Sequence, residues 1–265
     1  MYATKYTKAT SLHDAVAKLA AAEDGKFLGG GQTLIATMKQ RLAAPSDVID
    51  LTKIPELKGI TVEGDTVVVG AASTHSEIAQ SADIQRVLPS LAGLAATIGD
   101  PAVRNMGTMG GSVANNDPAA DYPAALLGLG ATVTTSKGSY TADEFFQGIF
   151  ETALDEDEII VKISFPVPRK AAYEKFRNPA SRYALCAVFV AMTADGPRVA
   201  VTGSGNEGVF RVTAMEEALA AHWSADAVAG IAIDPETMLA DIHGSAEYRA
   251  HLVSVLAARA VAKAG

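Results

Sequence analysis

Three consecutive glycines and two polar residues, at positions 29–33, separate a short apolar stretch from a helical pattern. Glycines let a backbone approach a ligand closely, and successive N–H groups at a helix start form a site for an anion. The same run also suits a tight strand-to-helix turn without any ligand. Neither the G-x-G-x-x-G fingerprint nor the G-x-x-x-x-G-K-[ST] phosphate loop fits it. This first glycine segment alone therefore predicts either a turn or one half of an anion site.

A second glycine-rich segment, residues 104–112, also combines glycines with small hydroxyl side chains, those of Thr108 and Ser112. A polar cluster at residues 115–121 follows it inside an otherwise apolar stretch. Asp117 and Pro118 have the residue types of a helix N-cap and of a first helical position, so a helix could begin there. Two such segments, each interpreted as a loop, favour a long, diphosphate-containing ligand that the two loops bind from opposite sides.

The elements that must position these segments follow from local patterns. Ser11 can cap a helix whose apolar residues have a period of 3.6, and a hairpin signal lies around residues 63–65. Helical pattern covers residues 34–42 and 75–98, with an interruption at Pro89. Strands are expected at residues 26–29, 48–51, 131–135 and 158–165, and in the C-terminal part at 183–193 and 198–203, before helices around 212–222 and 246–262. Strands followed by helices indicate an α+β C-terminal domain.

The composition describes a folded, acidic protein. The chain has 265 residues, 49% hydrophobic and 20% charged, with a formal net charge of −8. This length suits about two domains, and the hydrophobic content excludes intrinsic disorder. Binding of nucleic acid is not expected, because a phosphate-tracking surface needs clustered Lys and Arg. No apolar run reaches the ~20 residues of a membrane helix and no signal peptide is recognised, so we expect a cytoplasmic protein.

Metal-ligating residues are sparse. The single cysteine, Cys186, excludes an intrachain disulfide and a cysteine-ligated cluster, and it is best interpreted as a buried apolar residue. No two of the histidines have the H-x-x-x-H spacing of a metal-binding pair. We therefore expect no metal site in this chain. The histidines are His13, His75, His222, His243 and His251.

Three stretches carry a specific family resemblance: GGGQTLIATMKQRL, VIDLTKI and IGDPAVRNMGTMGGSVANNDPAADYPAALLGLGA. With them the chain resembles the FAD-binding medium subunits of the molybdenum hydroxylases, in particular those of aerobic carbon monoxide dehydrogenases, and more distantly the flavin domain of xanthine dehydrogenases. The resemblance implies an α+β protein with a two-subdomain FAD-binding fold of the vanillyl-alcohol-oxidase (PCMH) type, followed by an α+β C-terminal domain. It implies boundaries at 1–57, 58–168 and 169–265.

The resemblance also implies which residues bind FAD. The first segment would wrap the pyrophosphate with its N–H groups, and the second would approach with backbone and hydroxyl donors. Asp121 matches an aspartate at the polyol region, Ile160 an aliphatic residue on the flavin ring, and Lys175 a lysine at the ring's polar edge. Without such contacts, Ile160 would be an ordinary core residue and Lys175 a solvated lysine on an edge strand. Tyr183 could flank the ring or belong to the core. The complete set of expected FAD contacts is Phe27, Leu28, Gly29, Gly30, Gly31, Gln32, Thr33, Leu34, Thr108, Met109, Gly110, Gly111, Ser112, Asn115, Asp121, Ile160 and Lys175.

By this resemblance the chain is an electron-transfer subunit with non-covalent FAD and no catalytic acid–base pair of its own. Its partners would be a large molybdopterin-binding subunit and a small [2Fe-2S] subunit, assembled as a dimer of heterotrimers. One alternative is a free-standing FAD-dependent oxidoreductase that acts on a small molecule. Another is a nucleotide-binding module without catalysis, against which the two glycine segments and Asp121 argue.

Overall fold

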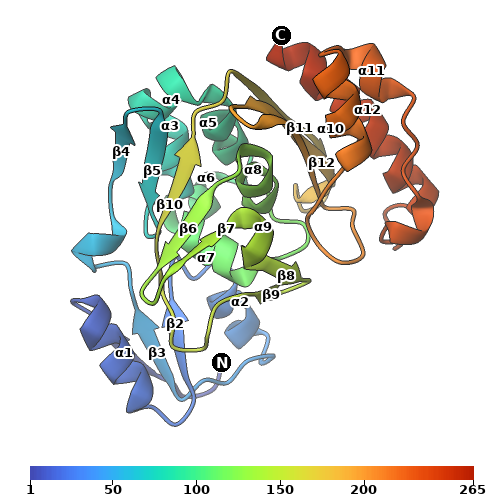
Figure 1. The fold of residues 1–265 in the computed structure, drawn as a ribbon. Coiled ribbons are helices and arrows are strands. Elements are labelled where there is room, and N and C mark those ends of the chain that lie inside the picture. The colour runs from blue at the N-terminus through green and yellow to red at the C-terminus, as the bar shows by residue number, and fades with distance from the viewer.

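The computed structural model describes residues 1–265 as three main β-sheets with their surrounding helices. In Figure 1 the sheets follow the chain from the blue N-terminal part, through the cyan-to-yellow centre, to the orange and red C-terminal part. The predicted α+β class is confirmed. None of the helices has the length and apolar content needed to cross a bilayer.

The N-terminal sheet is parallel and has the strand order β1–β3–β2. Ser11 caps its first helix by accepting a hydrogen bond from the Asp14 N–H, as its residue type predicts. The apolar side of that helix closes a small core around the buried Ala15, Ile49 and Leu57. The elements are β1 (Lys5–Lys8), α1 (Leu12–Ala20), β2 (Gly25–Leu28), α2 (Leu34–Lys39), β3 (Asp47–Asp50) and the short helix η1 (Pro55–Leu57).

The central sheet is antiparallel, with the order β4–β5–β10–β6–β7. The β4–β5 hairpin turns at Gly64, whose φ of +61° is left-handed, so the predicted hairpin is present. Strand β10 inserts between β5 and β6 and completes the sheet. The elements are β4 (Ile60–Glu63), β5 (Thr66–Gly70), α3 (His75–Gln80), α4 (Ala82–Val87), α5 (Pro89–Ala96), α6 (Pro101–Met106), α7 (Met109–Asn115), α8 (Tyr122–Leu129), β6 (Thr132–Thr135), β7 (Ser139–Thr141), α9 (Ala142–Phe145), β8 (Phe146–Gly148), β9 (Glu151–Thr152) and β10 (Ile160–Pro166).

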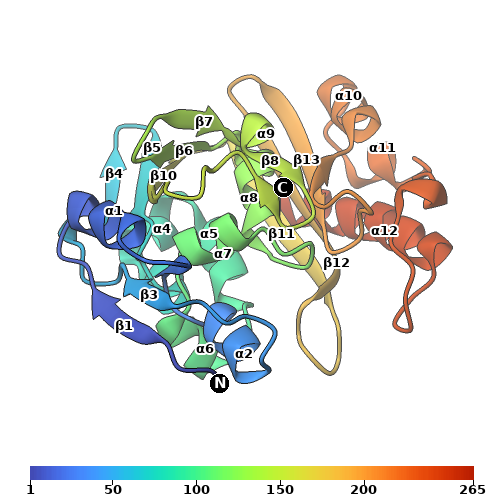
Figure 2. The same ribbon diagram turned by 90° about the horizontal axis from the view of Figure 1, so that it is seen from below.

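The C-terminal sheet, β11–β12–β13–β14, is antiparallel and lies between α8 on one face and α12 on the other (Figure 2). Because both faces are covered, residues 184–191 of its second strand are all buried. Gly128 lets α8 pack directly on this strand, since a Cβ there would lie 2.7 Å from the Phe189 ring. The elements are β11 (Lys170–Arg177), β12 (Ala184–Thr193), β13 (Gly196–Thr202), β14 (Phe210–Arg211), α10 (Thr213–Ala221), α11 (Ala225–Ala229), η2 (Pro235–Thr237) and α12 (Ala246–Ala264).

Two local predictions in the central part are wrong. The second glycine-rich segment is not a loop, because the Thr108 hydroxyl accepts a hydrogen bond from the Gly111 N–H and caps helix α7. The helix predicted to begin at Pro118 begins at Tyr122 instead. The reason is that the Asp117 carboxylate accepts a hydrogen bond from the nearby Ala119 N–H and closes a separate turn.

The structure also contains an edge strand for which the sequence patterns gave no bounds. Strand β11 has the sequence KAAYEKFR, which lacks the β-branched residues that usually mark a strand. It is held by pairing with β12 along its length. This strand carries Lys175 and therefore determines where that residue lies.

Candidate functional site

A cavity of about 490 Å³ lies between the N-terminal and central sheets. Its volume is in the range of small-molecule and cofactor sites. Of the predicted contacts, only Met109 and Lys175 do not line it. The predicted residues that do are Phe27, Leu28, Gly29, Gly30, Gly31, Gln32, Thr33, Leu34, Thr108, Gly110, Gly111, Ser112, Asn115, Asp121 and Ile160.

The first glycine segment lines this cavity with unpaired backbone donors. None of the N–H groups of residues 29–33 donates a hydrogen bond within the chain, and pairing resumes at the Ile35 N–H. Gly31 has a left-handed φ of +73°, which turns the chain from β2 toward α2. Successive N–H groups at such a turn form a concavity that binds anions. Because these N–H groups have no partner within the chain, they can donate to a ligand in the cavity.

Gly30 brings the two glycine segments into direct contact. A Cβ at this position would lie 1.9 Å from the Met106 carbonyl oxygen and 2.6 Å from the Gly107 Cα. The opposing backbone is fixed, since the Gly107 N–H donates to Val103 and the Gly107 carbonyl accepts from the His75 N–H. Glycine is therefore required at position 30 for the close approach of the two backbones, and its contact with a ligand stays a prediction.

The second glycine segment provides the cavity with polar side chains rather than with unpaired backbone N–H groups. The N–H groups of Met109 and Gly110 donate to the backbone carbonyls of Ser73 and Ala71, and the Met109 side chain is fully buried. A Cβ on Gly110 would lie 2.6 Å from the Ala71 Cβ, so this glycine serves packing. The Ser112 hydroxyl and the Asn115 side chain line the cavity and make no hydrogen bond within the chain. These two groups remain for a ligand.

Asp121 is buried in the cavity wall and is held by two residues of β11. The Lys175 Nζ lies 2.9 Å from its carboxylate, and the two side chains are 3% and 5% exposed. The Tyr173 hydroxyl also donates to this carboxylate. Burial and then the nearby Asp121 charge raise the pKa of Tyr173 well above its ordinary value, so the hydroxyl keeps its proton. Asp121, the predicted polyol aspartate at the start of α8, and Lys175, the predicted ring-edge lysine on β11, are thus partners of each other.

The charge in the cavity is mostly negative. Lys26 is the only Lys or Arg in its lining, against several carboxylates, of which the buried ones are Asp121 and Glu158. Glu158 accepts hydrogen bonds from the hydroxyls of Thr135 and Tyr140. An anionic ligand would therefore be held by the unpaired N–H groups of the first segment rather than by cationic side chains.

Two further residues, Ile160 and Tyr183, line the cavity with an apolar and an aromatic side chain. Ile160 is 4% exposed and is the first residue of strand β10. Tyr183 lines the cavity yet is 52% exposed, so it is not a core residue. Burial, followed by the charges of Asp117 and Asp121, raises its pKa. An apolar and an aromatic side chain here can pack against a flat ring system.

His75 lines the cavity and was not predicted to do so. Its Nδ1 lies 3.2 Å from the Tyr122 hydroxyl, and it is 4% exposed. Burial, with a smaller contribution from Arg104, lowers its pKa to about 4, so the ring is neutral at neutral pH. A lone histidine at a helix start carries no sequence signal of this environment.

We expect acid to destabilise the chain through His75. Its pKa is 6.5 when unfolded and about 4 when folded. Between these values the unfolded state binds more protons, so this stability is complete above pH 6.5 and is lost as the pH falls toward 4. The free energy of unfolding should fall by about 2 kcal/mol between pH 7 and pH 5.

Urea unfolding at the two pH values measures this loss. In His75→Gln the difference in the free energy of unfolding between pH 7 and pH 5 should largely disappear. In the control Tyr122→Phe it should persist, because burial and not the hydroxyl is the main cause. Equal pH dependence in wild type and His75→Gln would show that another group is responsible.

Comparison with known proteins identifies relatives of the whole chain. Residues 2–168 match a family described as the FAD-binding domain in molybdopterin dehydrogenase. The chain is 36% identical to the nicotine 6-hydroxylase medium subunit of Paenarthrobacter nicotinovorans, with 99% of this chain and 98% of that protein aligned. It is 35% identical to the carbon monoxide dehydrogenase medium chain of Afipia carboxidovorans, over 98% of this chain and 96% of the relative. The structure of reconstituted carbon monoxide dehydrogenase from Oligotropha carboxidovorans aligns with a TM-score of 0.89 and 32% identity, covering 99% and 97% of the two chains.

Proposed function

The chain belongs to the family of FAD-binding domains of molybdopterin dehydrogenases, and we propose that it is the FAD-carrying electron-transfer subunit of a molybdenum hydroxylase. In this role it passes electrons from iron–sulfur clusters on a partner to an external acceptor. The holoenzyme would be of the carbon monoxide, aldehyde or xanthine dehydrogenase type. The observation that carries the proposal is the row of unpaired N–H groups at residues 29–33 on a cavity of cofactor size.

The residues present fit FAD. The N–H groups of the first segment are suited to the pyrophosphate, and Ser112 and Asn115 to its polar neighbours. Ile160 and Tyr183 are suited to the flavin ring. When bound, FAD supplies the capacity to take up electrons and release them again. The chain's own residues hold it and limit the access of water.

Of the Asp121–Lys175 pair, only Asp121 lines the cavity. Lys175 contacts Asp121 and would therefore affect the cofactor through that residue. The ammonium group compensates the buried carboxylate, and the Tyr173 hydroxyl fixes its orientation. One face of Asp121 still lines the cavity and remains suited to the polyol chain of the cofactor. We therefore assign Lys175 to positioning Asp121.

The partners follow from the same proposal. A large molybdopterin-binding subunit would hydroxylate the substrate, and a small [2Fe-2S] subunit would carry the electrons here, in a cytoplasmic dimer of heterotrimers. Within this chain, we propose that residues 1–57 and 58–168 form the two FAD-binding subdomains and 169–265 the C-terminal domain. The three sheets support this division.

We expect one non-covalently bound FAD per chain. Cys186 is fully buried, and the one histidine that lines the cavity, His75, is packed against Gly107 and Tyr122. Neither is placed for a flavin bond. Acid precipitation of the purified chain should release all of the yellow colour as FAD, identified by chromatography. Colour that stays with the precipitate would contradict non-covalent binding, and a colourless chain that cannot be loaded with FAD would contradict the proposed function.

A further inference from the structure

The imidazole ring of His75 lies where the two glycine segments meet. A Cβ on Gly107 would lie 2.6 Å from the His75 Nε2, and a Cβ on Gly30 would lie 2.6 Å from the Gly107 Cα. All three residues line the cavity. The Nε2 edge of the ring is therefore beside the contact between the two segments, in the wall of the proposed cofactor site.

The Tyr122 hydroxyl determines which ring nitrogen carries the proton. Tyr122 is fully buried, and the one hydrogen-bond partner of its hydroxyl within the chain is the His75 Nδ1, at 3.2 Å. Burial, and then the Asp121 charge, raise the pKa of Tyr122 well above its ordinary value, so the hydroxyl keeps its proton. Because a buried O–H group is normally hydrogen-bonded, Tyr122 donates and Nδ1 accepts. The ring is neutral, so its one N–H group is at Nε2.

This Nε2–H group has no acceptor within the chain. The only hydrogen bond of the His75 side chain is the one with Tyr122, although the residue is 4% exposed. A buried donor without a partner is unfavourable, and such groups are uncommon in native proteins. The Nε2–H group is thus a preformed donor at the cavity wall, with its tautomer fixed before any ligand binds.

The charge beside this donor favours an anionic acceptor. Helix α6 packs against α3, and its Arg104 contributes to the lowered pKa of His75. The Arg104 guanidinium is held in place by donating to the carbonyls of Ile98 and Gly99. On α3 itself, the Glu77 carboxylate is engaged in the capping box at the start of the helix. A neutral donor near a fixed positive charge suits a phosphate oxygen.

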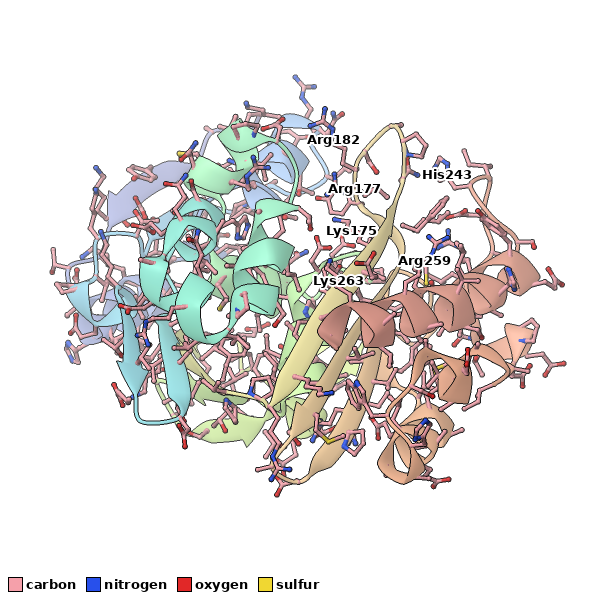
Figure 3. All side chains as sticks on the ribbon, turned by 90° about the horizontal axis from the view of Figure 1, so that it is seen from above. Lys175, Arg177, Arg182, His243, Arg259 and Lys263 are labelled. Atoms are coloured by element: carbon pink, nitrogen blue, oxygen red, sulfur yellow. The ribbon has the colours of Figure 1, made fainter.

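The other basic side chains do not take over this task. Figure 3 labels six of them in the C-terminal part, from Lys175 on β11 to Lys263 on α12, and none of the six lines the cavity. Lys175 is paired with Asp121 at 2.9 Å. Lys26, the only Lys or Arg in the lining, has a side chain that is 56% exposed. A pyrophosphate in the cavity would therefore depend mainly on uncharged donors, which are backbone N–H groups and the Nε2–H group of His75.

We propose that the Nε2–H group of His75 donates a hydrogen bond to the pyrophosphate of the bound cofactor, beside the backbone donors of the first glycine segment. This inference rests on the proposed function, because it requires FAD in the cavity. Tyr122 is then a positioning residue, which acts by keeping the proton on Nε2.

Nuclear magnetic resonance of the apoprotein with nitrogen-15-labelled histidine tests the tautomer and the contact. His75 should show an unprotonated Nδ1 and a protonated Nε2, and the His75→Gln spectrum identifies its signals. ADP, which carries a pyrophosphate, should shift the Nε2 signal clearly more than adenosine or riboflavin does. In Tyr122→Phe both tautomers should be populated, because the hydroxyl that selects one of them is gone.

FAD titration separates the donor from the packing of the ring. His75→Leu removes the donor and should weaken FAD binding about 10-fold, as expected for one hydrogen bond to a charged group. His75→Gln keeps a side-chain N–H donor and should stay within about 3-fold of wild type, with circular dichroism to check both folds. The control His13→Gln changes an exposed histidine on α1, away from the cavity, and should bind FAD as wild type does.

Three results would overturn the inference and leave the proposed function intact. They are a protonated Nδ1, an Nε2 signal that responds to adenosine or riboflavin as strongly as to ADP, and equal FAD affinity of the His75→Leu and His75→Gln chains. A wild-type chain that binds neither FAD nor ADP would instead refute the proposed function itself.

Discussion

Replacing Gly30 by alanine should strongly weaken FAD binding. The new Cβ would lie 1.9 Å from the Met106 carbonyl oxygen, far inside contact distance, and the opposing Gly107 backbone is held by hydrogen bonds to Val103 and His75. The two glycine segments must then separate, and the N–H groups of residues 29–33 lose their position relative to Ser112 and Asn115. Overpacking of this kind costs about 1–3 kcal/mol even where the structure relaxes. We expect apparent affinity for FAD to fall at least about 100-fold, because a site displaced from its ligand loses several hydrogen bonds together.

The measurement is FAD titration of the apoprotein, followed by flavin fluorescence, with circular dichroism to check the fold. Gly93→Ala is the matched control, since a Cβ there meets no atom within 4 Å on the exposed side of α5. Gly29→Ala should have an FAD affinity between those of the Gly30→Ala and Gly93→Ala chains. Its Cβ would make one close contact, with the Thr108 hydroxyl at 2.8 Å, and this side-chain atom can move. A Gly30→Ala chain that binds FAD as tightly as the Gly93→Ala chain would refute the required contact between the segments.

The first half of the site could be predicted from sequence because its signals are local. An apolar stretch, three glycines and a 3.6-residue pattern give the order β2, turn and α2 that the structure shows. The conformation of the second segment depends on distant contacts. Two glycines disfavour a helix by about 1 kcal/mol each, and the packing of Gly110 on Ala71, with the Thr108 cap, compensates for this.

Long-range pairing explains the other differences. Lys175 and Asp121 are separated by 54 positions, and nothing around either residue indicates that they meet. The pairing requires β11, a strand stabilised by its neighbour β12 rather than by its own residue types. The environment of His75 is likewise created by Tyr122 and Gly107, which the chain brings together only when it folds. The roles of these residues toward FAD stay predictions.

The isolated chain should be unable to oxidise a substrate by itself. The buried carboxylates that line the cavity are already engaged, Asp121 by Lys175 and Glu158 by Thr135. His75 is neutral with a pKa of about 4 and lies against Tyr122. The two buried carboxylates are therefore not free to act as a general base, which must reach the proton it removes. We therefore expect the chain to hold a flavin and to exchange electrons, and not to activate a substrate bond.

Anaerobic flavin reduction, followed by the loss of absorbance at the flavin band, tests this central claim most directly. The FAD-loaded chain alone should be bleached by dithionite but not by carbon monoxide, aldehydes, purines or N-heterocycles. After the large and iron–sulfur subunits of its complex are added, the complex's own substrate should bleach the flavin at about 1–1,000 s⁻¹, the ordinary range of enzyme turnover. Bleaching of the isolated chain by a small-molecule substrate at such rates would contradict the account and identify the chain as a free-standing oxidoreductase.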